Sequence, residues 1–219
     1  MLAILAILGL LVFPVRAEDR GCVALTFDDG PSGRFTLRLL EGLRSRGVKA
    51  TFLLCGYRIE DYPSSAQAIL DGGHEVGIHG YSHRDMGRMS YSDVALEISQ
   101  TLALLPGQEI RFFRPPGGVV TPAIEQAARD SGLAILHWSL DPKDWACDDA
   151  GTIVRRVVEQ AKNGDVILLH DMTDSSVDAA LEIVDCLLAR GFCFLTASEL
   201  ARANGIMPQP GREYHALGQ

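Results

Sequence analysis

Two adjacent carboxylates and two closely spaced imidazoles are the side chains of this sequence best suited to hold a metal ion. Asp28 and Asp29 lie in the string TFDDGP, and His79 and His83 enclose the string HGYSH. Neighbouring carboxylates repel one another unless a proton or a cation relieves them. Two histidines at this spacing would share one face of a helical turn and offer two nitrogens to one ion. With one aspartate they would form a two-histidine, one-carboxylate site with positions open for water and substrate.

Each pair also has a plain structural interpretation. Gly30 and Pro31 make the chain turn, so the two aspartates could belong to an ordinary polar turn. A histidine pair at this spacing is often just a solvated helix face. The zincin metalloproteases share the spacing, but they carry a glutamate after the first histidine, where this chain has Gly80. A general base would therefore have to come from elsewhere in the chain.

Three further strings carry polar residues that could take part in hydrolysis. Arg114 begins RPPGG, in which the prolines stiffen the loop and Gly117 leaves a backbone N–H to donate to an oxyanion. Asp144 and Trp145 end DPKDW, and His170 precedes an aspartate in LLHD. A histidine beside a carboxylate is suited to general acid catalysis, because the carboxylate fixes its tautomer. Alone, each string would be read as a surface loop or a structural residue.

The elements that must position these side chains are strands alternating with helices. Seven short apolar or β-branched runs predict strands at 22–27, 50–54, 74–78, 111–113, 133–139, 166–169 and 192–195. The segments between them have helical apolar spacing, most clearly at 35–46, 91–105 and 176–190. This alternation predicts a parallel sheet, either open and doubly wound or closed as a (β/α) barrel. The polar strings follow carboxyl ends of strands, which converge on one face.

Composition supports one compact domain, which we expect to span 20–203. The 219 residues are 47% hydrophobic and carry a formal net charge of -8, the wrong sign for binding nucleic acid or anionic lipid through a basic face. Five cysteines include no CxxC pair, so neither a zinc knuckle nor a dense disulfide scaffold is indicated.

The two ends of the chain differ from the domain between them. The apolar run 2–13, followed by a small-x-small pattern, predicts a signal peptide over 1–17. An uncleaved anchor or a misassigned start is the alternative, although the run is too short for a stable membrane span. Residues 204–219 show no periodicity and are rich in glycine, proline and polar residues, which predicts a loose C-terminal tail.

The polar strings together resemble the five motifs of the polysaccharide deacetylases, carbohydrate esterase family 4. They occur in the family's order: TFDDGP, HGYSH, RPPGG, DPKDW and LLHD. The resemblance covers residues 23–200, nearly all of the chain after the predicted signal. It implies a distorted (β/α) barrel of about seven parallel strands in a single domain. It also implies a metal-dependent hydrolase that removes acetyl groups, usually N-linked, from sugar polymers.

The resemblance assigns roles to three groups of residues. Three would hold the metal: Asp29, His79 and His83. Four would carry the chemistry: Asp28 as general base, Arg114 holding Asp28, His170 as general acid, and Asp144 paired with His170. Three would shape the acetyl pocket: Pro116, Gly117 and Trp145. The ion would be zinc, with cobalt or nickel as alternatives, because this donor set accepts all three.

Two positions depart from the family's commoner pattern. Gly80 stands where the family usually has serine or threonine, and Gly117 stands where a bulkier residue is frequent. Glycine at position 117 would alter the substrate preference more than the hydrolytic reaction itself.

We expect a secreted or envelope-associated monomer that deacetylates N-acetylglucosamine or N-acetylmuramic acid residues, first of peptidoglycan. The alternatives are chitin or poly-N-acetylglucosamine as substrate, an O-acetyl esterase on the same site, and an inactive glycan-binding protein.

Overall fold

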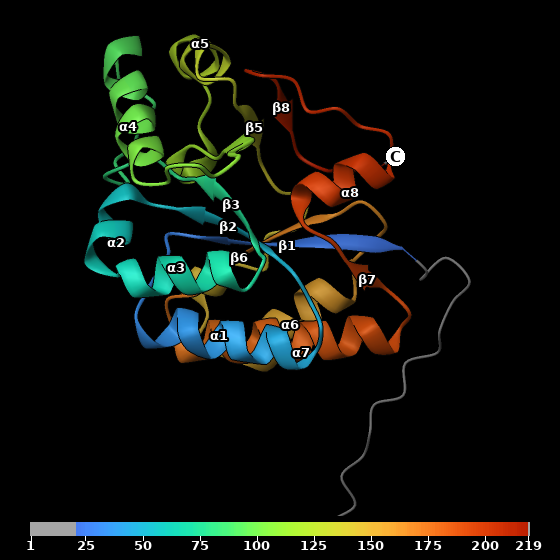
Figure 1. Ribbon diagram of the computed structural model, residues 1–219. Helices are drawn as coiled ribbons and strands as arrows, with labels where there is room; N and C mark the ends of the chain where they lie inside the picture. The colour runs from blue at the N-terminus through green and yellow to red at the C-terminus, as the bar shows by residue number, and fades with distance from the viewer. Residues whose placement is uncertain (1–20, 219) are drawn as a thin grey trace, which may run out of the picture.

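The computed structural model describes residues 21–218, so the predicted signal peptide lies outside the described residues (Figure 1). One sheet holds eight strands, and every pair of neighbouring strands is parallel. The strands are β1 (Cys22–Asp28), β2 (Thr51–Leu54), β3 (Glu75–Ile78), β4 (Phe112–Phe113), β5 (Ala134–Leu136), β6 (Val166–His170), β7 (Cys193–Phe194) and β8 (Glu213–Tyr214). Their order is β6-β1-β2-β3-β4-β5-β8, and β7 pairs with β1.

Helices connect the strands as the alternating pattern predicts. They are α1 (Arg34–Ser45), α2 (Gly56–Asp61), α3 (Pro63–Asp71), α4 (Tyr91–Ala103), α5 (Pro122–Asp130), α6 (Ala150–Val158), α7 (Asp174–Ala189) and α8 (Ala197–Ala203). Two 3₁₀ turns, η2 (Pro116–Gly118) and η3 (Asp144–Ala146), follow β4 and β5. In Figure 1, α1, α6 and α7 lie together under the sheet, while α8 lies on its other side.

The sheet curves until its ends approach one another. The segment after β5 returns to β6, where Leu140 bridges Ile167 in parallel and the Leu168 N–H donates to the Leu140 carbonyl at 2.9 Å. This confirms the predicted distorted barrel of about seven parallel strands, to which β8 adds a further strand.

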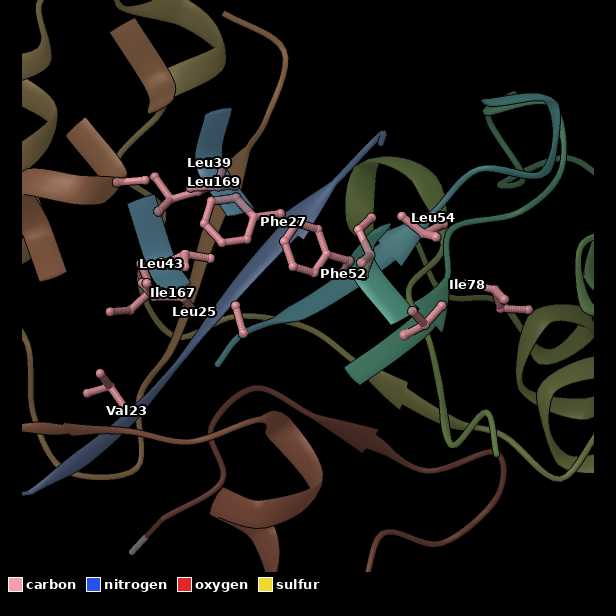
Figure 2. Close-up of a cluster of buried hydrophobic side chains, with 14 of the residues drawn as sticks. Val23, Leu25, Phe27, Leu39, Leu43, Phe52, Leu54, Ile78, Ile167 and Leu169 are labelled. Carbon is pink, nitrogen blue, oxygen red and sulfur yellow. The ribbon is translucent and has the colours of Figure 1, made fainter. Parts of the chain in front are cut away.

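Alternation along β1 separates an outer core from the inside of the barrel. Val23, Leu25 and Phe27 face the helices, where Phe27 stacks on Phe52 of β2 with ring centroids 5.2 Å apart (Figure 2). Successive side chains of a strand point to opposite faces, so Thr26 and Asp28 point inward. This two-residue period therefore turns the polar residues near the end of β1 away from the helices.

The inside of the barrel changes from apolar to polar along the strands. Its apolar part joins Ala24, Leu53 and Phe112 to Leu200 of α8, all fully buried. Arg114 follows Phe112 by two residues and thus shares its face, also fully buried. The interior consequently becomes polar toward the carboxyl edge of the sheet, where the sequence placed its candidate site.

The C-terminal segment corrects the prediction of a loose tail over 204–219. Glu213–Tyr214 forms β8, which pairs with β5, and Leu217 is fully buried against the inner core. The Asn204 side chain donates to the Leu217 carbonyl at 2.8 Å. The apolar pattern of residues 204–219 did not indicate this strand, because a strand of two residues and one buried leucine create no periodicity.

A disulfide joins β1 to β7, which the scattered cysteines did not reveal. Cys22 and Cys193 lie opposite one another on paired strands, with Cα atoms 4.5 Å apart and a sequence separation of 171. Cys55, Cys147 and Cys186 are free, as the odd count requires for at least one thiol. The bridge therefore fixes the first strand of the domain to a strand near its end.

Replacing Cys193 with serine is expected to lower the free energy of unfolding by about 2–5 kcal/mol, because a bridge across so long a loop strongly restricts the unfolded chain. Urea unfolding of the oxidised wild type and the variant would measure the difference. Cys186→Ser is the matched control, since Cys186 is a free thiol. Equal loss in both variants would show that the bridge adds nothing.

Candidate active site

The carboxyl edge of the sheet brings together polar side chains from β1, β3, β4 and β6. Asp28 ends β1, His79 follows β3, Arg114 follows β4 and His170 ends β6. Asp28 and His170 are direct partners in the register of β1 and β6. The topology thus juxtaposes residues that lie up to 142 positions apart in the sequence.

Asp29, His79 and His83 form a compact cluster suited to a cation. Asp29 Oδ1 lies 2.9 Å from His83 Nε2 and 3.3 Å from His79 Nε2. His79 Nδ1 lies 2.7 Å from the Arg114 carbonyl, which can only accept, so Nδ1 carries the proton and Nε2 offers a lone pair. Asp29 Oδ1 is buried without a hydrogen-bond partner among residues 21–218. An oxygen in this position, facing two imidazole nitrogens, fits a divalent ion.

The charge state of Asp29 agrees with that fit. Burial opposes ionisation, but the close approach of both imidazoles outweighs it and holds the pKa of Asp29 far below its usual range. The carboxylate is therefore negatively charged at neutral pH, as a metal ligand must be.

His79 and His83 lie on a loop, so the prediction that they share a helical turn is wrong. No helix covers residues 79–83, where Gly80 has φ 76° and His83 has φ 57°. A Cβ on Gly80 would lie 2.5 Å from Met86 Cε, in addition to the strain of a positive φ. The turn thus requires glycine at the position where the sequence departs from the commoner pattern of the family it resembles.

Glu97, which lies in none of the five motif strings, holds this loop. Its Oε2 accepts the backbone N–H groups of Tyr81 and Ser82 at 2.8 and 2.7 Å, and its Oε1 accepts the Ser82 hydroxyl at 2.6 Å. The signal was present in the sequence: Glu97 follows Val94 by three residues on the apolar face of α4. An acid on a buried helix face needs partners, and here they are the loop that carries the histidines.

Asp28 is held by a fully buried arginine. Arg114 Nη1 donates to Asp28 Oδ1 at 2.6 Å and to the Thr26 hydroxyl at 2.9 Å. Nε and Nη2 of Arg114 donate to the carbonyls of Leu136 and His137 at 2.7 and 2.6 Å. Asp28 Oδ2 lies 3.8 Å from His79 Nε2 and receives no donor from Arg114, so one carboxylate oxygen faces the cluster.

His170 pairs with Asp144, although a second aspartate is its neighbour in sequence. Its Nδ1 donates to Asp144 Oδ1 at 2.9 Å, and its backbone N–H donates to Oδ2 at 2.8 Å. Burial alone would lower the pKa of His170, but Asp144 and the charges of Asp28 and Asp29 raise it to about 9. The imidazole is therefore protonated at neutral pH and can give a proton from Nε2.

Asp171, the sequence neighbour of His170, points away from the site. Its carboxylate accepts the Thr36 hydroxyl, and its backbone carbonyl accepts the Ser32 hydroxyl at 2.7 Å. Burial raises the pKa of Asp171 to about 7. These contacts with Ser32 and Thr36 hold Asp171 against the start of α1, so Asp144 and not Asp171 partners the His170 imidazole.

The residues expected to shape a pocket lie on the turns beside these groups. Pro116 is buried, and its Cδ would lie 3.9 Å from a Cβ on Gly80, so η2 adjoins the histidine loop. Gly117 has φ 68°, and a Cβ there would meet no described atom within 4 Å. Trp145, beside Asp144 in η3, is 63% exposed. Open space at Gly117 and an exposed indole leave room for a ligand along this edge.

Trp138 is a further side chain that the motifs did not identify. The Arg114 guanidinium carbon lies 5.5 Å from the centre of its ring, and a Cβ on Gly118 would lie 2.8 Å from the same ring. Trp138 thus packs between the buried arginine and the RPPGG turn. Asp141, in contrast, accepts the Lys143 N–H at 2.8 Å and serves the turn before η3.

Replacing Asp144 with asparagine is expected to move the alkaline limb of the kcat–pH profile toward lower pH. Asp144 favours the imidazolium, so its loss lowers the pKa of His170, and the proton needed for general acid catalysis is lost at a lower pH. Asp141→Asn is the matched control, and initial rates between about pH 6 and pH 10 would measure the limb. If the alkaline limb stayed at the same pH, His170 would not be the general acid.

The same pairing has a consequence for stability. Folding raises the pKa of His170 from 6.5 to about 9. The protonated imidazole therefore adds to the free energy of unfolding fully below pH 6.5, and this addition is lost as the pH rises through about 9.

Known proteins with similar sequences match most of this chain. The family model for polysaccharide deacetylase matches residues 16–136. A peptidoglycan-N-acetylglucosamine deacetylase of Bacillus cereus is 36% identical over 193 residues, which cover 82% of this chain and 88% of that protein. Peptidoglycan-N-acetylmuramic acid deacetylase PdaC of Bacillus subtilis is 37% identical over 181 residues, which cover 81% of this chain but 38% of that longer protein.

Solved structures agree with these matches. A family 4 acetyl xylan esterase from Clostridium thermocellum, in complex with a cobalt ion, has a TM-score of 0.83 at 31% identity. The superposition covers 89% of this chain and 98% of that one. Sequence and fold thus lead to the same assignment: the chain belongs to the polysaccharide deacetylases, carbohydrate esterase family 4, a metal-dependent family of hydrolases.

Proposed function

We propose that this protein hydrolyses the N-acetyl groups of N-acetylglucosamine or N-acetylmuramic acid residues in peptidoglycan. The observation that carries the proposal is the different surroundings of the two adjacent aspartates. Asp28 is bound by Arg114 at 2.6 Å, whereas Asp29 Oδ1 faces two imidazoles and has no hydrogen-bond partner in the described part of the chain. One carboxylate is thereby available as a base and the other as a metal ligand.

Asp29, His79 and His83 would hold the ion. When bound, a divalent ion there polarises the acetyl carbonyl and lowers the pKa of the attacking water. The donor set suits zinc first, with cobalt or nickel as alternatives. Arg114 contributes twice, because its carbonyl fixes the His79 tautomer while its guanidinium holds Asp28.

Asp28 would take the proton of the attacking water. Its Oδ1 is occupied by Arg114, so Oδ2, on the side of His79, is the oxygen left for the water. The Gly117 N–H would donate to the developing oxyanion, as the open space above this glycine permits. These two groups act on the first half of the reaction, the addition of water to the amide.

His170 would give its proton to the departing sugar nitrogen. An amide cannot expel its nitrogen without a proton, and the pKa of about 9 that Asp144 maintains keeps the imidazole protonated at neutral pH. Trp145 would offer an aromatic surface to a sugar ring, and Pro116 would form part of the wall near the acetyl group. This division of labour places base and acid on β1 and β6, which are neighbours in the sheet.

The relatives support a cell-wall substrate. Two of them are deacetylases of peptidoglycan sugars, one acting on N-acetylglucosamine and one on N-acetylmuramic acid. Chitin or poly-N-acetylglucosamine is the alternative polymer. An O-acetyl esterase is the second candidate activity, because the similar cobalt-bound structure is an acetyl xylan esterase. An inactive glycan-binding protein is disfavoured by the intact set Asp28, Asp29, His79 and His83.

Export to the cell envelope agrees with both the proposed peptidoglycan substrate and the disulfide bond. Disulfides form and persist in oxidising compartments, and the Cys22–Cys193 bridge joins two strands of the sheet. No helix within residues 21–218 is long and apolar enough to cross a membrane. We propose secretion by the signal peptide over 1–17 and action as a monomer.

Acetate release would test the proposal directly. The purified protein should release acetate from N-acetylated chito-oligosaccharides and peptidoglycan fragments, lose this activity with a chelator and regain it with added Zn²⁺. Mapping the products would identify the sugar, and acetylated xylan would measure esterase activity. Metal-dependent release from the ester alone would favour the esterase, and no release from any glycan or ester would favour the binding protein.

A further inference from the structure

A second group of metal-ligating side chains lies outside the candidate active site, on the strand that the sequence pattern did not reveal. His137 follows β5, Glu213 lies in β8 and His215 follows β8. Their donor atoms all lie within 4.8 Å of one another. The parallel register aligns Leu136 with Tyr214, so His137 and His215 are the next pair along the two strands and share a face.

The geometry of this group resembles that of the cluster formed by Asp29, His79 and His83. His137 Nε2 lies 2.9 Å from Glu213 Oε2, the same separation as between His83 Nε2 and Asp29 Oδ1. Two ligands of a tetrahedral zinc ion, each about 2.0–2.2 Å from the metal, stand about 3.4 Å apart. An ion therefore needs a widening of only a few tenths of an ångström between His137 and Glu213.

The third ligand can reach the ion by turning its ring. The imidazoles of His137 and His215 stack with centroids 4.3 Å apart and planes at 7°, so their nitrogen lone pairs do not yet converge. His215 is exposed and can rotate, whereas His137 is buried and fixed by β5. A buried anchor beside an exposed, movable ligand permits binding from solvent without a change in the barrel.

The nearby charges leave the group open to a cation. Arg114 is the positive group next to His137, but its guanidinium is neutralised by Asp28 at 2.6 Å and donates to the His137 carbonyl. Glu213 supplies a negative charge with a side chain 38% exposed. Two imidazoles and one carboxylate form a donor set for zinc or a similar borderline ion, with water completing the coordination.

We propose that His137, Glu213 and His215 form a second divalent-cation site, separate from the catalytic one, that fastens β8 to β5. The site takes Zn²⁺ when the ring proton of His137 moves from Nε2, beside Glu213, to Nδ1, so that Nε2 offers its lone pair to the ion and the Glu213 carboxylate is freed to bind it. Since β5 also presents the Leu136 and His137 carbonyls to Arg114, the ion would stabilise the strand that supports the buried arginine. The proposal does not depend on which glycan the enzyme deacetylates.

Zinc titration of the untagged, full-length mature protein would test the second site. The double variant His79→Ala/His83→Ala lacks the first cluster and should still bind one Zn²⁺ per chain and show a higher melting temperature with Zn²⁺. Adding His215→Ala should weaken this binding at least tenfold and abolish the rise. Glu213→Gln should do the same, whereas Glu159→Gln, a change at an exposed carboxylate elsewhere, should not.

The wild type provides an independent measurement that does not require the double variant to fold. It should bind two Zn²⁺ per chain, and His215→Ala should bind one while retaining wild-type turnover. Calorimetry gives the stoichiometry, and circular dichroism checks the fold of each variant. A single ion in the wild type, or undiminished binding after loss of His215, would overturn the proposal.

Discussion

Replacing Asp28 with asparagine is expected to lower kcat by about 10²–10⁴-fold, the usual contribution of a general base, while metal content stays at the wild-type level. Asparagine has the same shape and keeps an oxygen that can accept from Arg114 Nη1, which lies 2.6 Å from Asp28 Oδ1. Its amide cannot take a proton from water. The metal ligands are other residues, so the loss would lie in turnover rather than in metal binding.

The fold should tolerate this change. Without the Asp28 charge, Arg114 still donates to the Thr26 hydroxyl and to the carbonyls of Leu136 and His137. The buried guanidinium thus keeps its hydrogen bonds, although it loses its counter-charge, which costs stability. Asp141→Asn is the control for an aspartate at the same edge, and it should leave kcat unchanged. Near-wild-type turnover in Asp28→Asn would show that another group is the base.

Replacing His79 with alanine is expected to remove the catalytic ion and with it measurable activity. His79 is buried, and the Arg114 carbonyl at 2.7 Å from Nδ1 directs Nε2 toward Asp29. Loss of a group that merely orients a ligand typically costs about 10–100-fold in metal affinity, so loss of the ligand itself should cost more than about 100-fold. The variant should contain one ion per chain fewer than the wild type after dialysis.

Metal analysis and acetate release on the same preparations would measure both effects. High concentrations of Zn²⁺ should restore part of the activity, because Asp29 and His83 remain. His215→Ala is the histidine control, since His215 lies outside the candidate active site, and it should keep its turnover. A His79→Ala protein that retains the wild-type metal content and rate would exclude this residue as a ligand.

Much of the fold could be predicted because its signals are local. The seven predicted strands follow from short apolar or β-branched runs, and the clearest helices follow from the 3.6-residue period of apolar residues. The C-terminal segment lacked such a signal. Two residues of β8 are too few to alternate, and their pairing with β5 depends on a free strand edge that exists only in the folded sheet.

The candidate site was predictable in its membership but not in its contacts. The types and spacing of the adjacent aspartates, the histidine pair, Arg114 and His170 predict their role, and the sheet brings them to one edge. The expected helical turn at His79 and His83 was wrong, because a spacing of four does not distinguish a helix from a loop. Glu97 shapes that loop, and a lone acid on a helix gave no indication of its partners.

The sequence by itself determined the alternating strands and helices, the residue types of the site and its place at the carboxyl ends of the strands. Only the folded structure reveals that Glu97 holds the histidine loop, that Cys22 meets Cys193, and that β8 brings Glu213 and His215 to His137. The physical reason is the same in each case. Periodicity records which face of an element is buried, whereas these contacts join segments whose separation is set only when the sheet curves and closes.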